Sequence, residues 1–249
     1  LDDLEPLSLD ERGRALLLRQ ALNPPRDTTS DAALAEPAGW LARHRGQGLL
    51  PPLAAGELEA GGLSQRWRSL HASLEALGPE RRQLALWQNW QQELQWRGSS
   101  VLVLHTAKPR SRHRLELWLA LLLAAAADQG PLDGVLVARG AKDFGVQLRL
   151  QAPQVDSARA ELLRLLELRQ QWRQSCWPVP PETGWALLDK GEARAIETWE
   201  GGFQGRGERL DPEQALCFGS ELSGAALLAS GELAARAGEL LGPMRERLI

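Results

Sequence analysis

A cluster of basic side chains lies between residues 105 and 114. Its members are His105, Lys108, Arg110, Arg112, His113 and Arg114. The group leads into an apolar stretch, and cations at the N-terminus of a helix oppose the helix dipole. We therefore predict that Lys108, Arg110, Arg112 and Arg114 form an exposed positive patch that contacts DNA phosphates or an acidic partner surface. The alternative is a solvated turn.

A second candidate contact segment runs from Trp199 to Arg209 and combines glycines with arginines. The glycines allow close approach of another backbone or of a ligand. The guanidinium groups of Arg206 and Arg209 could meet a carboxylate or a phosphate. The alternative is a surface loop that Trp199 and Phe203 anchor in the core.

The order of predicted elements around the basic group suggests nuclease chemistry. Hairpin strands followed by a buried strand and a core helix are the plan of Mg²⁺-dependent nucleases of the restriction-endonuclease-like fold. Such sites need an Asp on one strand and an Asp/Glu-x-Lys on the next, because Mg²⁺ prefers carboxylate oxygens. Lys108 is present, but Thr106 stands where the carboxylate should be, and no acidic residue lies between Glu93 and Glu116. We therefore predict a degenerate PD-(D/E)xK core with no catalytic residue and no metal ligand.

Other catalytic patterns are missing from the sequence. It has no Gly-x4-Gly-Lys-Ser/Thr phosphate loop and no Gly-x-Ser-x-Gly elbow. Its four histidines do not pair at a zincin spacing, and the separation of Cys176 and Cys217 fits no zinc motif. We therefore predict neither a cofactor nor a small-molecule substrate.

Alternating and continuous apolar runs predict the sheet that would position these groups. Three strands are expected near 82–89, 91–97 and 100–105, a buried helix over 111–128, and two strands around 135–138 and 146–150. Helical periodicity surrounds this unit. We expect helices over 9–22 with Asp10 as the cap, over 57–77, over 157–174 with Asp156 as the cap, and near 182–189, 191–199, 211–217 and 231–247. The fold class is thus mixed α/β, a sheet core flanked by helices.

Length and composition set outer limits. The 249 residues are predicted to form a single nuclease-like domain with a helical part over 1–80, the sheet and buried helix over 81–155, and a helical part over 156–249. The formal net charge of -3 confines any nucleic-acid contact to a local patch. The longest apolar run, 117–127, is too short to cross a bilayer, and two cysteines fit a reducing cytoplasm. Because residue 1 is Leu, we expect a piece of a longer chain.

Several ordered stretches together resemble the C-terminal region of the RecC-type gamma subunit of exodeoxyribonuclease V. The stretches are Glu5-Pro6-Leu7-Ser8-Leu9-Asp10 before Leu18-Arg19-Gln20, Gly48-Leu49-Leu50-Pro51, Leu115-Glu116-Leu117-Trp118-Leu119, Trp177-Pro178-Val179-Pro180-Pro181 with Gly184-Trp185-Ala186, Trp199-Glu200-Gly201, Gly207-Glu208-Arg209-Leu210-Asp211-Pro212 and Leu241-Gly242-Pro243.

The resemblance implies a non-catalytic domain of a helicase-nuclease complex that processes DNA ends for recombination and repair. It implies a nuclease-like fold without carboxylates, which agrees with Thr106. It also implies contacts with DNA and with the beta (helicase-nuclease) and alpha (helicase) subunits, and no contact with a membrane. Two alternatives remain: an active Mg²⁺-dependent nuclease of the same fold, and a scaffold that contacts only protein.

Overall fold

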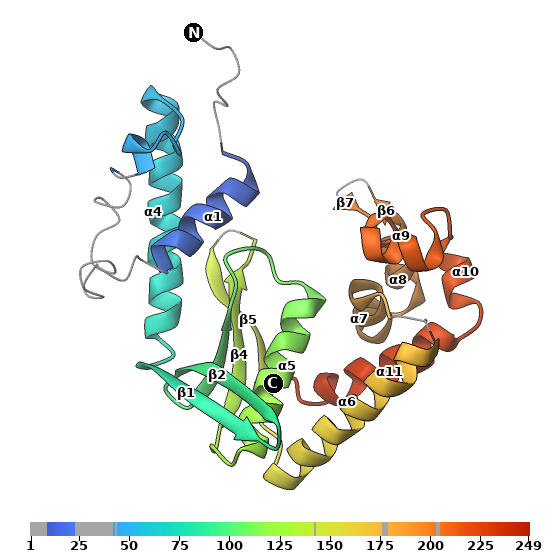
Figure 1. The fold of residues 1–249 in the computed structure, drawn as a ribbon. Coiled ribbons are helices and arrows are strands. Elements are labelled where there is room, and N and C mark those ends of the chain that lie inside the picture. Colours follow the sequence, from blue (N-terminus) through green and yellow to red (C-terminus); the bar gives the residue numbers. More distant parts are fainter. Residues whose placement is uncertain (1–8, 23–41, 43, 142, 176–178, 203–204) are drawn as a thin grey trace. The chain divides into compact units, whose positions relative to one another are not determined.

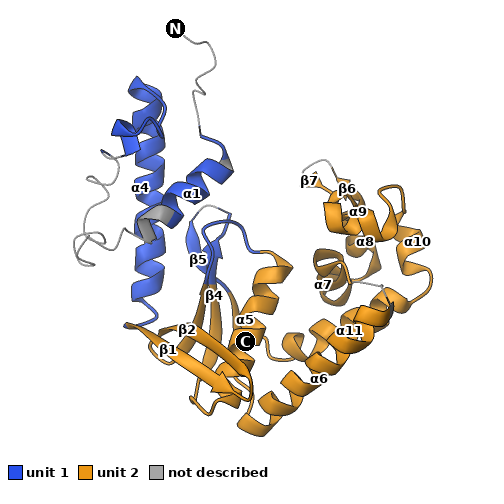
Figure 2. Cartoon of the chain, in the orientation of Figure 1, with its two compact units in different colours: residues 1–79, 104–109, 137–147 blue, residues 80–103, 110–136, 148–249 orange. Residues whose placement is uncertain are grey.

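The computed structural model describes residues 9–22, 42, 44–141, 143–175, 179–202 and 205–249 (Figure 1). Residues 24–37, Trp177 and Phe203 lie outside these ranges. The chain divides into two compact units (Figure 2). Unit 1 comprises Leu1–Pro79, Leu104–Pro109 and Val137–Gln147, and unit 2 comprises Glu80–Val103, Arg110–Leu136 and Leu148–Ile249.

The structure contains a five-stranded sheet in the order β1-β2-β3-β4-β5. Its strands are β1 (Glu80–Trp87), β2 (Trp90–Arg97), β3 (Ser100–Leu104), β4 (Asp133–Arg139) and β5 (Phe144–Gln151). The pairs β1/β2 and β2/β3 are antiparallel. The amide of Leu132 donates to Ser99 O, and the amide of His105 donates to Val137 O. Because later residues of β3 pair with later residues of β4, the two strands are parallel. The sheet is therefore mixed.

Helix α5 (Ser111–Ala126) connects β3 to β4 and is the central helix of unit 2. Most of its residues are buried, because its Leu and Ala side chains are apolar around the whole helix rather than along one stripe. In the buried cluster of unit 2, α5 packs with side chains such as Trp96, Val103, Leu162 and Trp185. This is the buried helix that the sequence predicts.

Unit 1 contains α1 (Glu11–Leu22) and α4 (Leu53–Glu75). Asp10 accepts a hydrogen bond from the amide of Gly13 at 2.6 Å, which confirms the predicted cap. Glu59 of α4 accepts hydrogen bonds from the Arg14 guanidinium of α1, and this partner lowers the pKa of Glu59. The buried side chains of α4 include Leu63, Trp67, Leu70 and Leu74, which follow the predicted helical period.

The rest of unit 2 is built largely of helices after the sheet. They are α6 (Val155–Ser175), α7 (Pro181–Lys190), α8 (Glu192–Glu200), α9 (Pro212–Phe218), α10 (Gly224–Leu228) and α11 (Glu232–Arg245). The short strands β6 (Gly201–Gly202) and β7 (Gly205–Arg206) pair as a hairpin, followed by the 3-10 helix η1 (Glu208–Leu210).

The mixed α/β class and the five predicted strands are confirmed. One cap prediction is wrong, because α6 begins at Val155 and includes Asp156 in its first turn. The hairpin β6/β7 and helix α10 are not predicted from the sequence. They are too short to show a hydrophobic period.

Candidate functional site

The basic group meets α5 at its first turn, where side chains alternate between buried and exposed. Ser111 and His113 are buried, whereas Arg110 and Arg112 are exposed. The Arg110 amide donates to His113 Nδ1 at 3.1 Å, and Arg112 Nε lies 3.2 Å from His113 Nε2. A neutral imidazole offers one acceptor nitrogen, so it accepts from only one of these donors at a time. The hydrogen bond from Arg112 to His113 therefore competes with that from the Arg110 amide, and the Arg112 residue is exposed.

A glutamate from a distant part of the sequence caps this helix. Glu182, in the first turn of α7, accepts the Ser111 amide at 2.7 Å and the Ser111 hydroxyl at 2.8 Å. A carboxylate at a helix N-terminus interacts favourably with the dipole and satisfies free amides. A residue 71 positions away thus supplies the acidic group that the basic segment itself lacks. The hydrogen bonds from Ser111 to the Glu182 carboxylate involve neither the Arg110 nor the Arg112 side chain.

A second glutamate caps α7 in the same way. Glu208, only 6% exposed, accepts the amides of Glu182 at 3.0 Å and Thr183 at 2.7 Å, and the Thr183 hydroxyl at 2.6 Å. Burial raises the pKa of Glu208, although the three hydrogen bonds act in the opposite direction. We call Glu208, Glu182, Thr183 and Ser111 the capping chain, because it joins η1 to α7 and α7 to α5.

Glycines around the β6/β7 hairpin bring Glu208 to this position. Gly201 has a φ of +83°, which favours glycine. A Cβ on Gly207 would lie 2.3 Å from the carbonyl oxygen of Trp199, so no larger residue fits there without a backbone shift. Trp199 is fully buried and donates from Nε1 to the Leu222 carbonyl at 2.7 Å. Trp199 therefore anchors this segment in the core, which is the alternative that the sequence analysis gives for it. Gly207 allows its backbone to approach the backbone of Trp199 and Glu200 closely.

Arg114 lies apart from the exposed patch that the sequence predicts. Its guanidinium carbon is 4.4 Å from the centre of the Trp185 ring, and Nη1 donates to Ser111 Oγ at 3.3 Å. Burial lowers the pKa of Arg114, and the charges of Glu182 and Asp189 oppose this effect. Arg114 therefore contributes to the packing between α5 and α7, because an indole face and two acids stabilise a half-buried cation.

The other predicted contact residues differ in their surroundings. Lys108 belongs to unit 1 and is exposed. Arg206 is exposed, but its Nη2 donates to the Leu210 carbonyl within the same segment. Arg209 is half-buried, and its Nε is buried with no acceptor in the part of the chain that the structure describes. Within unit 2, Arg110 and Arg112 are the predicted contact residues at the start of α5 that remain exposed.

The positions considered for a nuclease site have other contacts. Thr106 is 5% exposed and donates from Oγ1 to the Ala15 carbonyl at 3.0 Å, within unit 1. Glu93 is exposed, and its carboxylate lies 3.8 Å from Arg82 Nη1 in unit 2. Among the described residues, no group of three or more His, Cys, Asp or Glu side chains could hold a metal ion.

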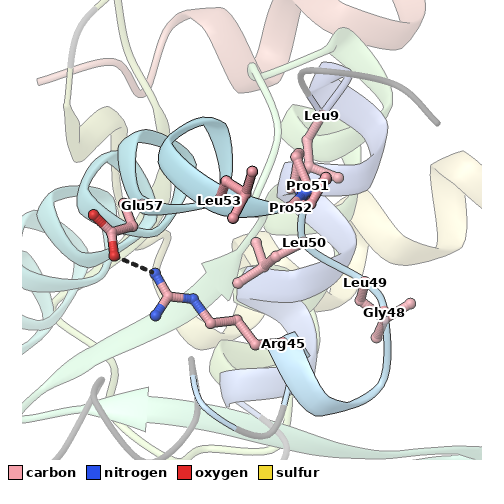
Figure 3. Close-up of a pocket in the computed structure, with 9 residues that line it drawn as sticks. All are labelled: Leu9, Arg45, Gly48, Leu49, Leu50, Pro51, Pro52, Leu53 and Glu57. Carbon is pink, nitrogen blue, oxygen red and sulfur yellow. Dashed lines mark ion pairs between the residues drawn. The ribbon is translucent and has the colours of Figure 1, made fainter.

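Unit 1 contains a hollow of about 620 Å³ (Figure 3). Its charged side chains are Arg45 and Glu57, whose Nη2 and Oε1 atoms are 3.8 Å apart and which Figure 3 joins by a dashed line. The other lining residues are Leu9, Gly48, Leu49, Leu50, Pro51, Pro52 and Leu53. This described lining offers one acid and one base in a weak surface pair, so it is an apolar surface rather than a catalytic constellation.

Comparison with known protein families matches residues 1–192 to the RecC C-terminal domain. The chain belongs to this family, as the ordered stretches of sequence indicate. Membership implies involvement in a RecBCD-type complex for DNA repair. The quoted stretches from Trp199 onward lie beyond the matched residues. A search of curated proteins gave no match. No helix in the described residues has the length and apolar character needed to cross a membrane.

Sequence reasoning missed the two glutamates of the capping chain. Glu208 is part of a quoted stretch, but nothing in its local pattern indicates burial or a capping role. Glu182 follows a proline pair, which predicts only the start of its own helix. Their partners are 25 and 71 residues away, beyond the range of any local capping pattern.

Proposed function

We propose that this chain is a non-catalytic domain of a helicase-nuclease complex of the exodeoxyribonuclease V type. In this proposal it guides a DNA strand and contacts the beta and alpha subunits in the cytoplasm. The single observation that carries the proposal is the exposure of Arg110 and Arg112 at a helix N-terminus that Glu182 already caps. Because the cap needs neither arginine, both guanidinium groups are available to phosphate oxygens.

A degenerate restriction-endonuclease-like core is the second part of the proposal. The hairpin β1/β2, the buried strand β3, the core helix α5 and the parallel strand β4 follow the plan of such nucleases. Thr106 is engaged with a backbone carbonyl, and Glu93 with Arg82. We expect no Mg²⁺- or Mn²⁺-dependent cleavage of single- or double-stranded DNA. Cleavage that Glu93→Ala abolishes would support the alternative of an active nuclease.

Contacts beyond the two arginines are proposed according to exposure. Lys108 and Arg206 are exposed and are further candidates for phosphate contact. Arg114 and Arg209 are half-buried, and we assign them to holding unit 2 together. A strand contact that involves few side chains agrees with the net charge of -3, which does not favour a broad DNA-binding face.

The test is DNA affinity as a function of salt for the assembled complex. We compare the wild type with Arg110→Ala/Arg112→Ala, and use Arg169→Ala/Arg173→Ala, two exposed arginines of α6, as the charge-matched control. Each lost phosphate contact should reduce the slope of log K against log salt concentration by about one unit. The loss of affinity should be the same for all DNA sequences. The control should keep the wild-type slope.

Other results distinguish the alternatives. An unchanged slope in Arg110→Ala/Arg112→Ala overturns the proposed DNA contact. If the complex itself fails to assemble with this variant, the arginines face an acidic partner surface. If neither binding nor assembly changes, the first turn of α5 is a solvated turn.

A further inference from the structure

The two margins of the sheet differ in how the chain covers them. The β5 margin is covered by the C-terminal residues: the amide of Gln151 donates to Arg247 O at 2.8 Å, and the amide of Ile249 to Arg149 O at 3.2 Å. Leu150 and Leu248 form an antiparallel bridge. The β1 margin (Figure 1) has no backbone partner in the described part of the chain. The β5 margin is therefore covered by backbone, whereas the described partner of the outward β1 backbone is one side chain, that of Gln129.

The hydrogen-bonding groups of the β1 margin follow from the register of β1 and β2. Trp87 pairs with Trp90 across a two-residue turn, and the ladder continues to Glu80 and Arg97. In an antiparallel pair, alternate residues direct their amide and carbonyl away from the partner strand. Gln129 Nε2 donates to the Leu84 carbonyl at 2.8 Å, so Leu84 is an outward residue. The backbones of Arg82 and Leu86 face outward with it.

The side chains beside this margin are apolar and exposed. Leu84 is 45% and Leu86 55% exposed, whereas Ala85, on the opposite face, is fully buried. The nearby charges already pair across β1 and β2: Arg97 Nη2 lies 2.9 Å from Glu80 Oε2, and Arg82 lies 3.8 Å from Glu93. The remaining charge of β1, Arg81, has its guanidinium carbon 4.3 Å from the centre of the Trp96 ring, and the stretch from Gln83 to Trp87 carries no charged side chain. Proteins usually protect such an edge with a charge, a proline or a bulge, because it templates strand pairing.

We propose that the outer margin of β1 receives an extended segment of another subunit of the complex as an additional strand. The segment carries uncharged apolar side chains beside Leu84 and Leu86, since a charge there would meet no free opposite charge. Pairing through the backbone supplies affinity, and alternate side chains supply specificity. The inference rests on the proposed function, which places the chain in an assembly.

The test is residue-resolved amide hydrogen exchange of this protein, alone and assembled with the beta and alpha subunits. We expect the outward amides of Leu84 and Leu86 to exchange at least about tenfold more slowly in the complex, since they gain acceptors. The amides of Gln83 and Ala85 face β2 and serve as internal controls that stay protected in both states. Protection in the isolated chain that grows with its concentration would indicate a second copy and overturn the inference.

A pair of variants separates backbone pairing from side-chain contact. Leu86→Pro removes an outward amide, and proline is tolerated on edge strands where the amide faces solvent. We expect it to weaken assembly about tenfold, while its unfolding transition stays close to that of the wild type. Leu86→Ser keeps the amide and should weaken assembly less.

The outcomes distinguish this inference from the proposed function. A complex that forms with unchanged exchange at Leu84 and Leu86 overturns the added strand and leaves the proposed function intact. Equal assembly by Leu86→Pro and the wild type also overturns it. If the wild-type chain does not associate with the two subunits, the proposed function and this inference fail together.

Discussion

The start of α5 and the segment from Gly205 to Leu210 both carry arginines, yet they use them differently. At α5, Glu182 caps the helix from outside, and Arg110 and Arg112 face solvent. In the second segment, Arg206 donates to the Leu210 carbonyl and Arg209 is half-buried, while the buried Glu208 caps α7. The same composition thus supplies exposed cations in one place and a structural support in the other.

The largest effect is expected from Glu208→Ala. The change leaves the amides of Glu182 and Thr183 and the Thr183 hydroxyl buried without their acceptor. We expect a loss of about 2–4 kcal/mol in the free energy of unfolding, measured by urea denaturation. Glu208→Gln keeps one acceptor oxygen and should lose less. A loss under about 0.5 kcal/mol for Glu208→Ala would show that the second segment is an ordinary surface loop.

The pH dependence of stability sharpens the same point. Burial raises the pKa of Glu208 above its ordinary value of 4.5, so the folded state holds this proton at pH values where the unfolded chain has released it. The folded state then binds more protons, and the Glu208 contribution to the free energy of unfolding falls as pH rises from 4.5 through the raised value. Glu208→Gln cannot titrate and should lack this decline. Parallel stability profiles for the variant and the wild type would contradict the assignment.

Glu182→Ala should have an intermediate effect. It removes the acceptor of the Ser111 amide and hydroxyl. It also removes the acidic group that offsets the basic side chains at the N-terminus of α5. We expect a loss of about 1–2 kcal/mol in thermal or urea unfolding. Ser111→Ala, which removes only the hydroxyl, is the matched control and should cost less. Equal stability of Glu182→Ala and the wild type would mean that α5 needs no external acid.

The smallest effect is expected from Arg114→Lys. Lysine keeps the charge but loses the planar guanidinium that lies over Trp185. We expect a loss of about 0.5–1 kcal/mol in unfolding, and no change in the salt dependence of DNA affinity in the assembled complex. A flattened salt slope would place Arg114 with Arg110 and Arg112 in the contact surface.

Much of the fold follows from local patterns in the sequence. The alternation in 80–97, the continuous apolar run of β3 and the all-round apolar helix α5 each specify their element, because burial dictates the period. Asp10 caps α1 through a residue three positions away, a range that sequence patterns cover. The family can also be inferred from the sequence, because stretches that resemble it occur in the expected order along the chain.

Tertiary structure alone decides whether each of these charged side chains is buried, paired or exposed. The sequence places cations at the start of α5 and an acid at Glu182, but only folding brings the two together across 71 positions. It likewise buries Glu208 against Thr183, packs Arg114 against Trp185 and leaves the β1 margin without a backbone partner among the described residues. The physical reason is range. Hydrophobic periodicity is a local property of the chain, whereas desolvation and pairing of charges depend on neighbours that the chain path supplies.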